Sequence, residues 1–256
     1  MSEHVRVERD GGVLAITLAR PERRNALTVD MYRALADAVE GAASDPDARL
    51  ITIRGDGRDF TAGNDLADFM TALPRDMGDE IPVWRLLRAL AANEIPIVAA
   101  VHGNCVGIGT TMLLHCDLVV AADSARFKMP FVELGLVPEA ASSLLFPALA
   151  GRRRSARYLL LGESFGPDEA LEIGLASHRA ADGELEQRLA ELVATLLAQP
   201  REALRLTQRL LRTGQRDLAT ERMKLENAHF SERLTSDEVK QAIADFFAAR
   251  AAKAAG

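Results

Sequence analysis

Hydrophobic positions near the start of the chain follow first a strand pattern and then a helix pattern. Residues 5–8 and 13–18 alternate apolar and polar side chains, and Asp10-Gly11-Gly12 between them predicts a hairpin turn. Apolar residues then recur at helical spacing over 28–39, where Thr28 suits the N-cap position. A short apolar strand is expected at 50–53. The opening therefore predicts a hairpin, a helix and a third strand.

The middle of the chain predicts a buried sheet. Residues 95–101 are nearly all apolar, which is typical of a strand covered on both faces. A glycine-rich turn at 103–109 and a buried helix through Met112 follow, and 117–121 resembles another short buried strand. Helices are expected at 83–92, 152–161, 168–173, 184–198 and 201–212, with two more before Ala252. This order predicts an α/β core followed by a helical appendage.

Composition narrows the class of protein. The 256 residues are 48% hydrophobic and 27% charged, with a net charge of −6, which is ordinary for a globular protein and unlike a nucleic-acid binder. No apolar run is long enough to span a membrane. Cys105 and Cys116 are too few for a disulfide framework, and neither the cysteines nor the five histidines have metal-binding spacing. With no signal-peptide pattern and no peroxisomal C-terminus, we expect a cytoplasmic protein without a metal.

Two strand exits carry small residues and lead into helix starts. They are residues 60–66 and 103–109, and each could supply one backbone N–H to the same oxygen, as in an oxyanion hole. The glycines could equally serve tight helix–sheet packing, and Asp65 could be a simple N-cap. The spacing of Gly103, Gly107 and Gly109 differs from GxGxxG, which excludes a dinucleotide-binding fingerprint.

The segment Gly162-Glu163-Ser164-Phe165-Gly166 matches the GxSxG pattern of a nucleophile elbow. A true elbow follows a buried strand. Here the preceding residues have a helical pattern, so we interpret Ser164 as an ordinary loop serine.

Together these segments resemble the crotonase (enoyl-CoA hydratase/isomerase) superfamily over nearly the whole chain. The matching motifs are Arg20-Pro21-Glu22 with Asn25-Ala26-Leu27, Phe60-Thr61-Ala62-Gly63-Asn64-Asp65-Leu66, His102-Gly103 through Gly107-Ile108-Gly109 to Cys116-Asp117, and Phe127, Pro130, Gly135 and Pro138. The resemblance implies an α/β spiral of ββα units over residues 1–195. It also implies a C-terminal helical trimerisation region over 196–256 and assembly as a homotrimer or homohexamer.

The same resemblance assigns the ligand-binding residues. It places an oxyanion hole on the backbone N–H groups of Asn64 and Ile108, facing an acyl-CoA thioester whose coenzyme A is part of the substrate rather than a cofactor. The residues expected along the acyl-CoA are Arg24, Ala26, Leu27, Ala62, Gly63, Asp65, Leu66 and Phe131, with Phe69, Trp84 and Leu87 in the acyl pocket, and Phe246 and Arg250 covering coenzyme A from a neighbouring subunit. Arg20, Arg23 and Arg24 could contact its phosphates or form a solvated charged turn.

One departure from the family pattern bears on the reaction. Hydratases hold water with two glutamates, and the matching positions here are Thr111 and Phe131, neither of which can act as a base. Residues 134–143 instead resemble the LGxxPExxSS segment of peroxisomal-type Δ3,Δ2-enoyl-CoA isomerases, in which a glutamate at the position of Glu139 moves the proton.

The resemblance thus implies an isomerase that converts a 3-enoyl-CoA into a 2-enoyl-CoA with Glu139 as the base. Glu133 is the alternative base if the register differs, and Glu139 could instead be a stabilising first-turn carboxylate. The other hypotheses are a hydratase using another acid, a thioester hydrolase or decarboxylase, a GxSxG hydrolase, and a non-catalytic acyl-CoA-binding protein.

Overall fold

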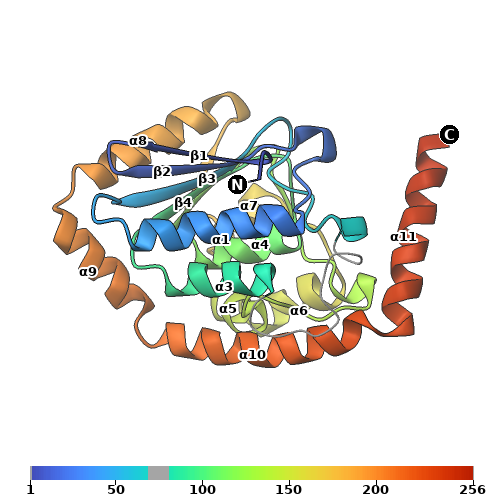
Figure 1. Ribbon diagram of the computed structural model, residues 1–256. Coiled ribbons are helices and arrows are strands. Elements are labelled where there is room, and N and C mark those ends of the chain that lie inside the picture. Colours follow the sequence, from blue (N-terminus) through green and yellow to red (C-terminus); the bar gives the residue numbers. More distant parts are fainter. Residues whose placement is uncertain (1, 69–80, 256) are drawn as a thin grey trace.

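A six-stranded sheet lies at the centre of the molecule, with helices over both faces (Figure 1). The computed structural model describes residues 2–68 and 81–255. In spatial order the strands are β1 (Val5–Asp10), β2 (Val13–Leu18), β3 (Leu50–Gly55), β4 (Ile97–Val101), β6 (Leu118–Ala122) and β8 (His178–Ala180). The β1–β2 hairpin is antiparallel and every later pairing is parallel. The α/β fold class expected from the sequence is confirmed.

Strand β4 is apolar throughout because its two faces belong to two different cores. Ile97, Ala99 and Val101 join the large core under α1 (Val29–Ala43) and α3 (Pro82–Ala92). Val98 and Ala100 face the other way and pack with α8 (Leu185–Leu197). Successive side chains of a strand point to opposite faces, so covering both faces requires an uninterrupted apolar run.

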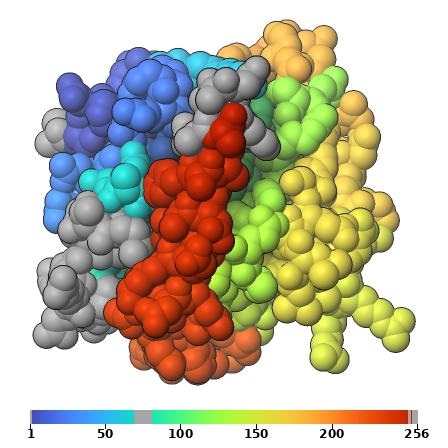
Figure 2. Space-filling view, turned by 90° about the vertical axis from the view of Figure 1, so that its right-hand side faces the viewer, coloured from blue at the N-terminus to red at the C-terminus, as the bar shows by residue number. Residues whose placement is uncertain are grey.

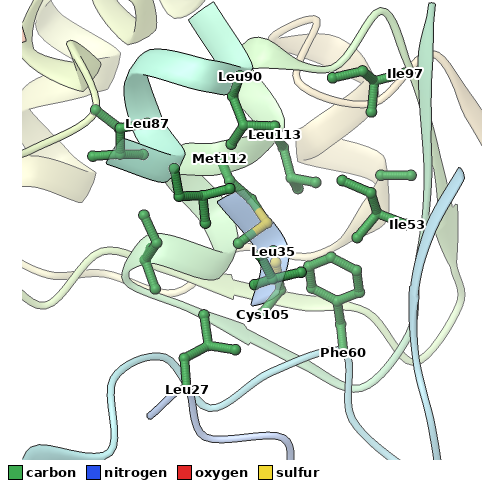
Figure 3. Close-up of a cluster of buried hydrophobic side chains, with 14 of the residues drawn as sticks. Leu27, Leu35, Ile53, Phe60, Leu87, Leu90, Ile97, Cys105, Met112 and Leu113 are labelled. Atoms are coloured by element: carbon green, nitrogen blue, oxygen red, sulfur yellow. The ribbon is translucent and has the colours of Figure 1, made fainter. Parts of the chain in front are cut away.

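The large core gathers side chains from the whole length of the chain. Figure 3 shows Leu35 of α1, Leu87 of α3 and Ile53 of β3 in one buried cluster with Phe60 and Met112. All five are at most 3% exposed. Fully burying a side chain of this size contributes about 1.5–3 kcal/mol, so each of the five stabilises the fold substantially.

A second, two-stranded sheet was not expected from the sequence. It pairs β5 (Asn104–Val106) with β7 (Arg126–Lys128) in parallel. Strand β5 lies inside the segment that we interpreted as a glycine-rich turn, so that interpretation is wrong for three residues. A strand of three residues is too short to show periodicity, and its pairing depends on a partner more than 20 residues away.

The remaining helices lie outside the central sheet. Those whose bounds lie within residues 2–68 and 81–255 are η1 (Pro21–Arg23), α4 (Ile108–Thr111), η2 (Met112–His115), η3 (Val132–Leu134), α5 (Ser142–Ala150), α6 (Arg152–Leu160), α7 (Pro167–Glu172), η4 (Asp182–Glu184), α9 (Arg201–Arg212), α10 (Gln215–Leu234) and α11 (Asp237–Ala255). Helix α10 runs under α3 and α5, where Phe230 meets Trp84 edge to face at 5.7 Å (Figure 1). Helix α11 crosses one face of the molecule and contacts η3 (Figure 2).

Most expected elements are present with bounds shifted by one or two residues. Strand β2 and helix α9 have the expected limits, and Thr28 is the N-cap of α1, accepting a hydrogen bond from the backbone N–H of Met31. Strand β4 begins two residues late because Pro96 has no N–H to donate to a ladder. Helix α8 ends at Leu197, so the expected division after residue 195 lies in its last turn. No helix in residues 2–68 or 81–255 is long and apolar enough to cross a membrane.

Candidate active site

The loop at residues 61–65 is held between two neighbouring segments. Leu27 donates its N–H to Gly63 O at 2.8 Å and accepts from Asp65 N at 2.9 Å, while Thr61 N donates to Asn104 O at 2.9 Å. The two bonds to Leu27 use the residues on either side of Asn64, so the N–H of Asn64 points away from that ladder. No acceptor among the described residues takes it. Asn64 thus offers a free backbone donor.

Ile108 offers a second donor at the start of α4. Gly107, its N-cap, has a left-handed φ of 57° and donates its own N–H to Lys128 O at 2.8 Å. Thr110 N and Thr111 N both donate to Gly107 O. Because the first residues of a helix have no intrahelical acceptor, Ile108 N stays without one in the described part of the chain.

The two loops touch at Gly63. Its φ is 86°, and a Cβ added there would lie 2.8 Å from Val106 O and 3.9 Å from Gly107 N. Only glycine permits both the left-handed backbone and this approach. The free N–H of Asn64 comes directly after Gly63, and the free N–H of Ile108 comes directly after Gly107. Both donors therefore adjoin the point where the two loops touch. Such a pair can hold one negatively charged oxygen.

Glu139 is buried beside the same short helix. Its side chain accepts a hydrogen bond from Thr111 Oγ1 at 2.6 Å, and the residue is only 4% exposed. Burial raises the pKa of Glu139 to about 8; the Thr111 hydroxyl lowers this pKa and the charge of Glu226 raises it. Thr111 is three residues after Ile108, so α4 links the carboxylate to one of the two free N–H groups.

The chain after Glu139 makes a turn that L-residues rarely adopt. Ala140 and Ala141 have φ values of 61° and 56°, and both are fully buried. His115 Nε2 lies 2.8 Å from Ala140 O, and Glu226 Oε2 accepts from Ala141 N at 2.6 Å. Two consecutive left-handed alanines mark a turn that its neighbours must hold. Sequence reasoning missed His115 and Glu226, since both reach this turn only through tertiary contacts.

Tyr32 completes the polar lining, and sequence reasoning missed it as well. Its hydroxyl, on α1, donates to Asn64 Oδ1. Burial raises the pKa of Tyr32 well above its ordinary value, and the charge of Glu139 raises it further. The phenol therefore stays protonated and orients the Asn64 side chain.

Two of the segments expected along the acyl-CoA, residues 24–27 and 62–66, lie side by side. Ala62 N donates to Arg24 O at 2.9 Å, which joins segment 24–27 to segment 62–66. The guanidinium of Arg24 is exposed, whereas Arg20 donates to Asp65 Oδ2 at 2.7 Å. Burial raises the pKa of Asp65, but its bonds and ion pair with Arg20 lower it overall. Arg20 is thus paired with Asp65, whereas Arg23 and Arg24 are both exposed, and Arg24 Nε lies 3.9 Å from Asp59 Oδ2.

The remaining residues expected to bind the acyl-CoA differ in how far they are buried. The side chain of Leu27 is buried in the core, and Gly63 is buried, while Ala26, Ala62 and Leu66 are half-buried. Phe131 is buried, as are Trp84 and Leu87 on α3. Phe246 is exposed on α11, which also carries Arg250, whose side chain lies outside the described part; Phe69 lies outside the described residues altogether.

Two alternatives from the sequence lie elsewhere. Glu133 is half exposed and pairs with Lys128 Nζ at 2.8 Å, so it lacks the buried position of Glu139. Ser164 is exposed and follows helix α6 rather than a strand, which confirms its interpretation as a loop serine. Across residues 2–68 and 81–255, no group of three or more His, Cys, Asp or Glu side chains is arranged to hold a metal ion.

Known proteins similar to this chain are acyl-CoA enzymes of one family. The sequence model of the family described as enoyl-CoA hydratase/isomerase matches residues 8–254. The chain is 31% identical to 1,2-epoxyphenylacetyl-CoA isomerase of Escherichia coli, over the full length of both. It is also 31% identical to enoyl-CoA delta isomerase 2 of Rattus norvegicus, over 84% of this chain and 56% of that one. A solved enoyl-CoA hydratase/isomerase from Pseudoalteromonas atlantica superposes with a TM-score of 0.91 at 38% identity, covering 96% and 97% of the two chains.

Proposed function

The chain belongs to the enoyl-CoA hydratase/isomerase family of acyl-CoA enzymes, and we propose that it converts a 3-enoyl-CoA into the 2-enoyl-CoA by moving one proton on Glu139. The observation that carries this proposal is the buried carboxylate of Glu139, which accepts a hydrogen bond from Thr111 on the helix that begins with the free N–H of Ile108.

The two free backbone donors polarise the thioester. The carbonyl oxygen of the acyl-CoA accepts from Asn64 N–H and Ile108 N–H, which both lack an acceptor among the described residues. As the C2 proton leaves, charge develops on this oxygen, and each donor lowers the barrier by about 3–4 kcal/mol.

Glu139 carries the proton from one carbon to the other. Its carboxylate removes a proton from C2, and the electron pair moves into a dienolate with the charge on the thioester oxygen. The protonated carboxyl then delivers the same proton to C4, so the double bond lies between C2 and C3. One base suffices because both carbons share one face of the planar intermediate. A positioned base contributes about 100- to 10,000-fold to the rate.

The environment of Glu139 suits this role. Burial raises its pKa to about 8, so the carboxylate is a stronger base than an exposed glutamate and its conjugate acid still gives the proton back. The expected positions of the hydratase pair hold Thr111 and the buried Phe131. Neither can activate water, which favours proton transfer over hydration.

A second candidate substrate comes from the full-length similarity to 1,2-epoxyphenylacetyl-CoA isomerase. Rearranging such an epoxide also requires a polarised thioester and a proton transfer. The same oxyanion donors and the same carboxylate would serve that reaction, so the two substrates must be compared directly.

The test is Glu139→Gln, assayed with 3-hexenoyl-CoA by the conjugated absorbance of the product. We expect kcat to fall by about 100- to 10,000-fold while binding of the CoA ester persists. Glu133→Gln is the matched control, since Glu133 lies in the same region but is half exposed and paired with Lys128. If Glu139→Gln keeps the turnover of the unmodified enzyme, Glu139 is not the base. Hydration of crotonyl-CoA by the unmodified enzyme at a comparable rate would favour a hydratase instead.

The other parts of the ligand follow from the family resemblance. We propose that the exposed guanidinium of Arg24 contacts the phosphates of coenzyme A. The exposed Phe246 and its helix α11 would cover coenzyme A of a neighbouring subunit in a homotrimer or homohexamer.

A further inference from the structure

A charged side chain from a distant helix holds the turn that follows Glu139. Glu226 lies on α10 and is 5% exposed. Its Oε2 accepts from Ala141 N at 2.6 Å, and its Oε1 accepts from Ser143 N at 2.9 Å. The two N–H groups belong to the N-cap residue of α5 and to its first turn, where a carboxylate is favoured by the helix dipole. Burial raises the pKa of Glu226, while its hydrogen bonds with Ser143 and Ala141 and the charge of Arg222 lower it.

This contact has a conformational consequence. Ala140 and Ala141 both have left-handed φ values and are fully buried, and Glu139 directly precedes them. Left-handed residues with a Cβ are unfavourable unless surrounding groups hold them. Glu226 satisfies the N–H of Ala141, and His115 bonds the carbonyl of Ala140 at 2.8 Å. The direction of the Glu139 side chain therefore depends on these two contacts.

Of these two groups, only Glu226 adds a charge. Burial lowers the pKa of His115 to about 4, so the imidazole is neutral near pH 7. Near the pair lie the Thr111 and Tyr32 hydroxyls, from α4 and α1. Two guanidinium groups are also close: Arg222, one turn before Glu226 on α10, donates to Ser143 Oγ at 3.2 Å, and Arg212 on α9 donates to the carbonyl of His115.

We propose that Glu226 is a positioning residue for Glu139: it fixes the Ala140–Ala141 turn that aims the Glu139 side chain at Thr111, and it keeps a second buried carboxylate next to the first. The inference rests on the proposed function, in which Glu139 is the base. In agreement with this geometry, the charge of Glu226 is one of the causes that raise the pKa of Glu139.

The two effects of Glu226 can be separated with two variants. Glu226→Gln keeps the size and one acceptor oxygen but removes the charge, so the acid limb of kcat/KM for 3-hexenoyl-CoA should move to lower pH by roughly one unit. Glu226→Asp keeps the charge on a shorter side chain that cannot reach both N–H groups. It should leave the acid limb in place and lower kcat about tenfold or more with little change in KM. Glu221→Gln, an exposed neighbour on α10 paired with Lys224, is the control and should change neither.

A second readout is independent of turnover. Titration of the carboxyl infrared band that disappears in Glu139→Gln reports the protonation of Glu139 in the free enzyme, and Glu226→Gln should lower its midpoint. An unmoved midpoint in folded Glu226→Gln overturns the proposal. If that variant does not fold, an unchanged kcat in Glu226→Asp overturns it. If Glu139→Gln stays active while the infrared midpoint still moves with Glu226→Gln, the coupling stands and the proposed function fails.

Discussion

Thr111 and Glu139 share a hydrogen bond of 2.6 Å between two fully enclosed groups, although 28 residues separate them in sequence. The donor lies on α4, three residues after the free N–H of Ile108, and the acceptor is the glutamate that the family resemblance assigned as the base. This bond connects the proposed base to the proposed oxyanion hole. Its removal should therefore change the acid–base behaviour of the site before it changes the fold.

Thr111→Val removes this donor while keeping the shape of the side chain. The Thr111 hydroxyl lowers the pKa of Glu139, so the pKa should rise above its present value of about 8. We expect the acid limb of kcat/KM to move up by roughly one pH unit, with about tenfold less activity near pH 7. This is the opposite of the shift expected for Glu226→Gln. Thr220→Val on α10 is the control. An acid limb that moves to lower pH or stays in place in Thr111→Val would contradict the assignment of this limb to Glu139.

Stability should depend on pH through Glu139. Its folded pKa of about 8 lies above the ordinary 4.5, so between these values the unfolded chain loses a proton that the folded protein keeps. The free energy of unfolding therefore falls as pH rises from about 4.5 to 8, then levels off. Glu139→Gln lacks this contribution and should gain stability relative to the unmodified protein by up to a few kcal/mol over that range. Urea unfolding of both proteins at about pH 5, 7 and 9 measures the difference, and parallel pH profiles would refute it.

Gly63→Ala tests the contact between the two loops. The added Cβ would lie 2.8 Å from Val106 O on a backbone with φ of 86°, so the loops must separate. We expect a loss of roughly 2 kcal/mol in the free energy of unfolding and about 100-fold in kcat/KM, because the loops that carry the two free N–H groups move apart. At Gly183 an added Cβ meets nothing within 4 Å. Gly183→Ala should therefore stay within about 0.5 kcal/mol, and equal effects of the two substitutions would argue against the loop contact.

Phe246→Ala tests whether helix α11 covers coenzyme A. Phe246 is 44% exposed in the single chain and is expected to contact the ligand of a neighbouring subunit. We expect KM for 3-hexenoyl-CoA to rise about tenfold while kcat stays the same. The pantetheine thioester of the same acid lacks the nucleotide and should show no change. A KM that rises equally for both thioesters would mean that Phe246 acts elsewhere.

Local patterns predicted much of the fold correctly. The alternation at 13–18, the N-cap at Thr28 and the amphipathic pattern at 201–212 each depend on neighbours along the chain, and the structure has them at the expected positions. Strand β5 was missed because its three residues are defined by pairing with β7. Glu139 was found through a motif, but its partner Thr111, and the side chains of His115 and Glu226 that bond the turn after it, come from other elements and have no common sequence signal.

The amino-acid sequence alone was enough to determine the α/β class, the order of most elements, the family and the identity of the acidic residue at position 139, because these depend on local spacing and short motifs. Tertiary structure alone decided that this carboxylate is buried beside Thr111, that Gly63 brings two free N–H groups onto touching loops, and that Glu226 satisfies a strained turn. Burial and charge coupling depend on distances through space. A pKa shift is therefore a property of the packed fold and not of the motif that names the residue.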